Sequence, residues 1–241
     1  MVQKQKRNGD SRRTRPADSH YRNSRIKIVW LEIDGLISKL MELKDVVKDK
    51  KPQVICLTET KLSTNIIDDT LNIGNYNIWR KDRKFKQGGG VMILTSKELQ
   101  VKKIHANTIE MVELIAVEVK TKEGDIIIAT IYMPPQTKTW EKERYTELIE
   151  NTTKSTRALL QHTEDKAKRI ILNGDFNSNV NWESMETKGN ENQWVNKLVE
   201  LTQDFLLYQH VTANTRKRGP DEPSLLDLVF TRQKEDIESI I

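Results

Sequence analysis

The chain carries a carboxylate and a carboxamide two residues apart, directly after an apolar run. Residues 170–180, IILNGDFNSNV, begin with three aliphatic residues typical of a buried strand. The segment then changes abruptly to polar residues, among them Asp175 and Asn177. A strand that ends in this way presents two side chains able to exchange protons and hydrogen bonds with a ligand. This pair is therefore the first candidate for a functional site.

Other apolar runs also end in acidic or phenolic side chains. The positions concerned are Glu32, Asp34, Glu59, Tyr132 and Asp227. Simple exposure to solvent explains any one of them alone, but a recurrence at five strand ends favours a shared edge. Carboxylates gathered at one edge repel each other unless a cation lies among them. Hard oxygen ligands suit Mg²⁺ or Mn²⁺, and no cluster of histidine or cysteine suggests zinc.

Strand and helix patterns alternate along one continuous stretch. Apolar runs predict strands at 25–33, 53–59, 76–80, 90–96, 111–120, 125–133, 168–176 and 225–232. Helical spacing predicts helices at 35–50, 139–161 and 191–208. Gly124 is expected at the tip of a hairpin. Mixed elements in one pattern indicate a single α/β domain over residues 26–241.

The basic character of the sequence belongs to its N-terminal segment. Residues 1–25 hold eight of the 40 Lys and Arg residues but only two of the 35 Asp and Glu residues, which accounts for the net charge of +5. With almost no large apolar residues, this segment is expected to be a disordered tail. It is either a solvated leader or a nuclear-targeting or nucleic-acid tether.

Compartment and membrane association are constrained by what the sequence lacks. No apolar run is long enough to span a bilayer, and the N-terminus has no signal-peptide pattern. The single cysteine, Cys56, lies in an apolar run and is interpreted as a core residue. We expect a nuclear or cytoplasmic protein that is not secreted, does not bind membranes and is a monomer.

Five motifs occur in an order and spacing that resemble a known superfamily. They are VICLTETKL, GGGVMILTS, ATIYMPP, ILNGDFNSNVNW and SLLDLVFT. Together they resemble the endonuclease/exonuclease/phosphatase superfamily with the DNase I-like fold, and most closely the endonuclease domain of non-LTR (LINE-type) retrotransposons. The resemblance covers roughly residues 26–231. It implies an α/β fold of two packed mixed β-sheets flanked by helices, a four-layer sandwich with the site at one edge.

The resemblance implies a role for each strand-end residue. Asp175 would orient or deprotonate the attacking water, and Asn177 would contact the scissile phosphate or a metal ion. Glu59 would be the principal Mg²⁺ ligand, with Glu32 or Asp34 beside it. Tyr132 would hydrogen-bond the phosphate, and Asp227 would pair with a catalytic histidine. Phosphoryl transfer needs such a combination of positioned water and charge neutralisation.

Two positions depart from the family pattern. Glu32 replaces the asparagine usual at the end of the first strand, which adds negative charge where a phosphate approaches. The family's Ser-Asp-His strand is absent, and none of His20, His105, His162 or His210 fits its histidine. We therefore expect a domain that is incomplete at its C-terminus, lacks the final strands and has weak or no activity.

Two basic segments are candidates for contact with DNA phosphates. The loop after the third strand carries Arg80, Lys81, Arg83, Lys84 and Lys86, and residues 214–219 carry Arg216, Lys217 and Arg218. A solvated surface is the alternative for both. Three functions stay open: a divalent-metal-dependent DNA endonuclease of, or derived from, a retrotransposon; a non-catalytic remnant that binds nucleic acid or protein; and a phosphatase acting on a small-molecule or lipid phosphate.

Overall fold

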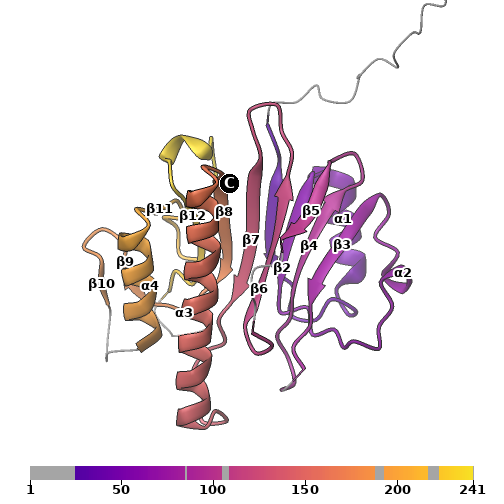
Figure 1. Cartoon of the computed structure of the whole chain (residues 1–241). Helices are drawn as coiled ribbons and strands as arrows, with labels where there is room; N and C mark the ends of the chain where they lie inside the picture. The colour runs from indigo at the N-terminus through magenta and orange to yellow at the C-terminus, as the bar shows by residue number, and fades with distance from the viewer. Residues whose placement is uncertain (1–24, 85, 105–108, 188–192, 217–222, 241) are drawn as a thin grey trace, which may run out of the picture.

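The structure is a computed structural model that describes residues 25–84, 86–104, 109–187, 193–216 and 223–240. Two β-sheets stand against each other between outer helices (Figure 1). The first sheet has the order β1-β2-β4-β3, formed by Ile28–Glu32, Val54–Thr58, Val91–Ser96 and Tyr76–Lys81. The second has the order β11-β12-β8-β7-β6-β5, formed by Tyr208–Gln209, Asp227–Thr231, Arg169–Asp175, Ile126–Tyr132, Glu113–Val119 and Val101–Ile104.

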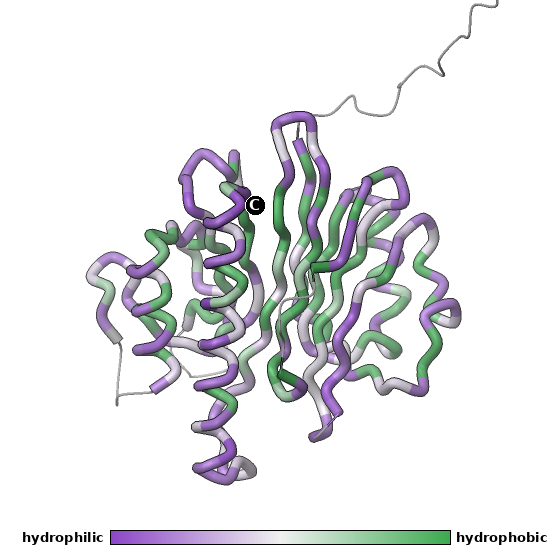
Figure 2. Tube along the Cα trace, in the orientation of Figure 1, coloured by the Kyte–Doolittle hydropathy of each residue, from purple (hydrophilic) through white to green (hydrophobic). Residues whose placement is uncertain are grey.

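Three apolar clusters separate four layers. Helices α3 (Lys142–Asp165) and α4 (Gln193–Asp204) pack on the second sheet around Trp194 and Phe230. Residues such as Ile93 and Ile128 fill the space between the sheets. Helix α1 (Leu40–Lys50), with the short α2 (Asp68–Leu71), covers the first sheet. Figure 2 shows apolar residues concentrated in the strands and polar residues on outer helix faces and loops. The expected four-layer fold is confirmed.

Parallel pairing brings the carboxyl ends of four strands to one edge. Strand β1 pairs with β2 in parallel, so that Glu32 lies opposite Thr58. Strand β7 pairs with β8 in parallel, so that Tyr132 lies opposite Asp175. Because β1 and β2 also contact β8, and β2 contacts β7, these ends face each other across the sandwich. The topology thus positions the expected site.

Gly174 explains why the run of apolar residues in β8 is broken just before Asp175. At φ +145°, a Cβ on this residue would lie 1.9 Å from the carbonyl oxygen of Ile131 on β7. No side chain fits there, because the obstacle is backbone and cannot rotate away. The glycine therefore lets β8 approach β7 closely enough to present Asp175 beside Tyr132.

All eight expected strands and three expected helices are present, with shifted ends. Helix α1 starts at Leu40 rather than near residue 35, because residues 36–39 form turns. The sequence pattern does not predict four of the short strands or the short η1 helix (Lys234–Asp236). These strands are β5, β11, β9 (Val180–Asn181) and β10 (Glu186–Thr187). The tail lies outside the described residues except for Arg25. Among the described helices, none is long and apolar enough to cross a bilayer.

Candidate active site

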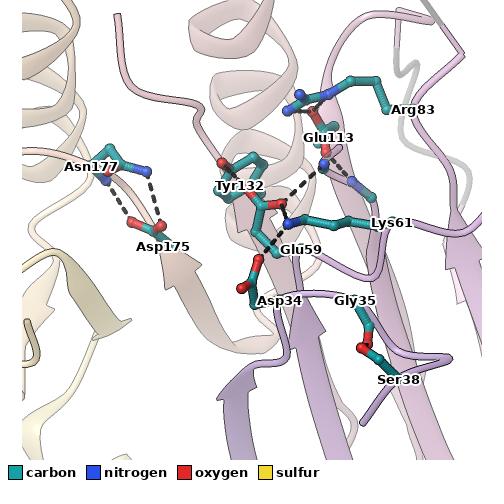
Figure 3. Close-up of polar contacts among 12 residues, drawn as sticks. Asp34, Gly35, Ser38, Glu59, Lys61, Arg83, Glu113, Tyr132, Asp175 and Asn177 are labelled. Carbon is teal, nitrogen blue, oxygen red and sulfur yellow. Dashed lines mark hydrogen bonds and ion pairs between the residues drawn. The ribbon is translucent and has the colours of Figure 1, made fainter. Parts of the chain in front are cut away.

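The sequence-predicted site residues gather at one edge of the sandwich in two groups. Figure 3 shows Asp175 with Asn177 on one side, and Tyr132, Glu59, Lys61 and Asp34 on the other. Tyr132 ends β7, Asp175 ends β8, and Glu59 directly follows β2. Asp227 reaches the same edge because it begins the antiparallel strand β12 and lies opposite Asp175.

Asn177 holds the Asp175 carboxylate in a fixed orientation. Its backbone N–H donates to Asp175 Oδ1 at 2.9 Å, and its side-chain Nδ2 donates to Oδ2 at 2.9 Å. The same Nδ2 also donates to the carbonyl of Met133 at 3.0 Å. Asn177 has φ 43°, a left-handed conformation that turns its amide back towards Asp175. Both carboxylate oxygens are thereby oriented, as a general base requires.

Burial and neighbouring acids raise the pKa of two of these carboxyls. The pKa of Asp175 rises from 3.8 to about 8, because the group is buried and because Asp227, Glu32 and Glu59 repel its charged form. The pKa of Asp227 rises to about 6 through burial and repulsion by Glu32, against the stabilising hydroxyl of Thr215. Asp227 Oδ1 is buried without a hydrogen-bond partner among the described residues. Without a cation nearby, both carboxyls therefore ionise less readily than an exposed aspartate.

Glu59 is the centre of the second group. The hydroxyl of Tyr132 donates to Glu59 Oε1, and the backbone N–H of Gly89 donates to Oε2 at 3.2 Å. Glu59 itself has φ 57°, a conformation that a bulky residue adopts only when its surroundings hold it. Burial and the nearby Glu59 carboxylate raise the pKa of Tyr132, which keeps it a neutral hydrogen-bond donor.

Lys61 supplies a cation that the sequence motifs do not assign to the site. Its ammonium pairs with Asp34 and lies 3.9 Å from Glu59 Oε2. Asp34 and Lys61 both have left-handed backbone conformations, at φ 47° and φ 52°, in the turns that follow β1 and β2. The position of Lys61 directly after the TET motif is the signal that could have found it. Its pKa is raised, first by the hydrogen bond to Asp34, so it stays charged.

The donor atoms at this edge suit a hard divalent cation, although the side chains described here are not arranged as a complete set of metal ligands. Glu59, Glu32 and Asp34 offer only carboxylate oxygens, and the raised pKa values of Asp175 and Asp227 reflect burial first and then repulsion by neighbouring acids. Within the described part of the chain, no three acidic, histidine or cysteine side chains converge as a complete ligand set. Glu32 is exposed, and Asp34 is turned to Lys61.

Three basic residues of the expected DNA-contact loop make contacts within the protein. Arg80 pairs with Asp68 at 3.1 Å and Asp82 at 3.5 Å. Lys81 donates to the carbonyl of Ile109 at 2.9 Å, and burial lowers its pKa to about 8. The side chain of Arg83 is 5% exposed and pairs with Glu113. Phosphate contact by these three stays a prediction, and of the three only the Arg83 guanidinium is buried in its ion pair.

The remaining basic residues have different surroundings, and two of them lie outside the described residues. Lys84 is exposed, and its Nζ lies 3.3 Å from Oε1 of the exposed Glu110. Lys86 donates to the hydroxyl of Thr139 at 2.8 Å and lies over the Trp140 ring at 4.1 Å. Arg216 is close enough to Asp227 to favour its charged form. Lys217 and Arg218 lie outside the described residues, so their assignment stays a prediction.

No histidine of the described residues approaches Asp227. His162 lies in the last turn of α3, and His210 shares a hydrogen bond with Thr231 at 2.6 Å. His20 and His105 fall outside the described residues. The orphaned Asp227 Oδ1 is consistent with this finding, since the histidine partner that the resemblance implies is not supplied by His162 or His210.

Known proteins share both sequence features and fold with this chain. Residues 126–240 match the model of a family described as endonuclease-reverse transcriptase. No curated protein matches the sequence. The AP endonuclease of Leishmania major superposes with a TM-score of 0.66 at 16% identity, over 86% of this chain and 78% of that one.

Two further structures share the fold. The endonuclease domain of TRAS1, a telomere-specific non-LTR retrotransposon, gives a TM-score of 0.59 at 14% identity, over 85% of this chain and 83% of that one. The catalytic domain of Xenopus laevis APE2 gives 0.62 at 14% identity, over 87% and 83%. These structural similarities confirm the expected DNase I-like fold, and the family match over residues 126–240 agrees with the resemblance seen in the motifs.

Proposed function

We propose that this chain, which has the fold of the endonuclease/exonuclease/phosphatase superfamily, is a divalent-metal-dependent phosphodiesterase that cleaves DNA. The observation that carries the proposal is the meeting of two groups at one edge: the Asp175–Asn177 pair and the Glu59–Tyr132 pair. Its neighbours in fold act in DNA processing by their names, including an AP endonuclease and a retrotransposon endonuclease domain. The family description and the TRAS1 similarity favour an origin in a non-LTR retrotransposon.

Asp175 acts as the general base for the attacking water. The two hydrogen bonds from Asn177 fix both of its oxygens, so that the carboxylate does not rotate during proton transfer. Its raised pKa makes it a stronger base than an exposed aspartate, once it is ionised. Positive charge brought by substrate-bound or protein-bound cations at this edge favours that ionisation.

Tyr132, Lys61 and the metal-binding acids act on the phosphate side. The neutral phenol of Tyr132 can donate to a phosphoryl oxygen when its hydrogen bond to Glu59 is released, because it has a single proton to donate. The Lys61 ammonium adds positive charge beside Glu59. Glu59, with Asp34 or Glu32, would hold Mg²⁺ or Mn²⁺, which when bound supplies Lewis-acid stabilisation of charge on the phosphate oxygens. The rest of the chemistry belongs to hydrogen bonds and charges of the protein.

Turnover is slow in this proposal. Asp227 Oδ1 lacks a partner among the described residues, and neither described histidine reaches it. A missing electrostatic stabiliser of this kind costs about 10²–10³ in rate. The chain is therefore expected to nick DNA measurably only at high protein concentration and long incubation.

The test compares substrate classes under one set of conditions. Supercoiled plasmid is incubated with the chain in Mg²⁺, Mn²⁺ or EDTA, beside a soluble inositol phosphate and an aryl phosphate monoester. Slow, metal-dependent conversion to open circles without phosphate release from the monoesters is the expected result. Phosphate release without nicking would favour the phosphatase alternative. No hydrolysis of any substrate would favour a non-catalytic binding protein.

A further inference from the structure

A buried ion pair lies directly behind the Glu59 group. Arg83 comes from the loop between β3 and β4, and Glu113 begins β6, where it lies opposite Tyr132. Arg83 Nε donates to Glu113 Oε1 at 2.6 Å, and their side chains are 5% and 3% exposed. Glu113 Oε2 also accepts the backbone N–H of Gly90. The pair thus joins a loop of the first sheet to a strand of the second.

The guanidinium of Arg83 touches both groups that hold the Glu59 carboxylate. It lies against Gly89, where a Cβ would be 2.4 Å from Arg83 Cζ. It also lies over the Tyr132 ring, with Cζ 5.4 Å from the ring centroid. Gly89 N–H and the Tyr132 hydroxyl are the donors to the two oxygens of Glu59. Figure 3 shows Tyr132 and Arg83 beside Glu59. Arg83 therefore sets the position of both donors.

The same loop also fixes the backbone on the C-terminal side of Glu59. Gly89 O accepts the N–H of Lys61 at 2.7 Å, and Gly90 O accepts the N–H of Thr60 at 3.2 Å. The left-handed conformation of Glu59 is thus held by a loop that Arg83 and Glu113 anchor. Movement of this anchor would shift the Glu59 side chain and its backbone together.

A gain in stability alone does not explain why this buried ion pair is present. Replacing a buried ion pair by apolar side chains is often neutral or stabilising, because two charges must be taken out of water. Groups that orient the ligands of a metal site typically change its affinity by about 10-fold to 100-fold when they are removed. The contacts of this buried pair converge on the Glu59 carboxylate. Orientation of a metal ligand therefore explains the pair better than a gain in stability does.

We propose that the Arg83–Glu113 ion pair positions Glu59 and thereby sets the affinity of this edge for a divalent cation. Arg83 and Glu113 are positioning residues in this proposal, since neither reaches the edge where substrate would bind. The proposal rests on the proposed function, in which Glu59 holds the metal. It also assigns Arg83 a role different from the phosphate contact expected from the charge run.

A matched control lies at the other end of the same strand. Glu118 on β6 is 3% exposed, like Glu113, and pairs with Lys168 and Lys102. Its partners belong to elements remote from Glu59, so that Glu118→Gln removes the charge of a buried carboxylate paired with two lysines without disturbing the site. Glu113→Gln keeps the size of the side chain and an acceptor for Gly90 N–H but removes the charge that faces Arg83.

The experiment measures Mn²⁺ binding by isothermal titration calorimetry, together with urea unfolding, on the whole chain. Native protein, Glu113→Gln, Arg83→Lys, Glu118→Gln and Glu59→Gln are compared. We expect Glu113→Gln and Arg83→Lys to bind Mn²⁺ about 10-fold to 100-fold more weakly. Glu118→Gln should lose comparable stability but keep native affinity, and Glu59→Gln should give no specific heat. If Arg83→Lys does not fold, Glu113→Gln alone carries the comparison.

Two different failures can be told apart. Native Mn²⁺ affinity in Glu113→Gln and Arg83→Lys, with binding abolished in Glu59→Gln, would show that the ion pair is only structural and would overturn this inference alone. Native affinity in Glu59→Gln, or no binding by the native chain, would overturn the metal assignment of the proposed function and the inference with it.

Discussion

Asp175 and Asp227 lie directly opposite each other on the antiparallel strands β8 and β12, with both side chains buried. The Asp227 carboxylate raises the cost of ionising Asp175 in the absence of a cation, in addition to the cost of burial. The pKa of Asp175 rises to about 8 and that of Asp227 to about 6. This arrangement has a measurable consequence for how stability depends on pH.

The metal-free protein should lose stability as the pH rises from about 4 to about 8. In this window folded Asp175 keeps a proton that the unfolded chain, with an ordinary pKa of 3.8, has already released. The stabilising contribution is complete below the unfolded pKa and is lost as the pH rises through the folded pKa. Asp175→Asn removes this dependence, so its stability relative to the native chain should improve towards high pH by on the order of 1–4 kcal/mol.

Urea unfolding in EDTA at about pH 5 and about pH 9 checks this expectation. The substitution has a constant cost, because Asn177 Nδ2 no longer has a carboxylate oxygen as acceptor. The change between the two pH values is therefore the quantity to compare. Native and Asp175→Asn curves that run parallel across this range would contradict the assignment of a raised pKa to Asp175.

Gly89→Ala should destabilise the protein by about 1–3 kcal/mol more than Gly74→Ala. The two glycines have similar backbone conformations, at φ +70° and φ +64°. A Cβ at position 89 would meet the Arg83 guanidinium at 2.4 Å, whereas one at position 74 would have no atom within 4 Å. The difference in unfolding free energy thus isolates the steric clash from the backbone strain. Equal destabilisation by the two substitutions would show that Arg83 moves away at no cost.

DNA binding should depend on Lys84 and Lys86. Neutralising both to Gln is expected to reduce the salt dependence of binding to duplex DNA, by about 0.9 in slope for each phosphate that the protein no longer neutralises. A matched control is Lys48→Gln with Lys50→Gln. These exposed lysines lie in the last turn of α1, which runs back from the site edge. Fluorescence anisotropy at several salt concentrations measures the slopes, and equal slopes in the two double variants would place the DNA elsewhere.

The location of the site could be predicted from sequence because its residues follow apolar runs. Asp175, Tyr132 and Glu59 each mark the end of a strand, and the parallel pairs β1–β2 and β7–β8 bring those ends together. The inward position of Arg83 could not be predicted. Within a run of Lys and Arg, no local pattern tells which side chain finds a buried partner, and Glu113 lies 30 residues away in sequence.

Weak periodicity explains why some elements could not be predicted. Strand β5, VKKI, exposes Lys102 and Lys103 in succession and belongs to the edge of its sheet, so it lacks the alternation of a half-buried strand. Strand β11 has two residues, too few for any period to be read. Both are held by pairing with longer neighbours rather than by their own sequence.

Plasmid nicking by the native chain, Asp175→Asn, Glu59→Gln and the control Glu118→Gln tests most directly whether this edge of the sandwich cleaves DNA. The four proteins are purified identically and assayed in Mg²⁺ and Mn²⁺. We predict slow, metal-dependent nicking by the native chain and Glu118→Gln. Nicking should fall by at least about 10²-fold in Asp175→Asn and Glu59→Gln, because one lacks the base and the other the principal metal ligand. Equal nicking by all four proteins would contradict the assignment, since the activity would then come from elsewhere.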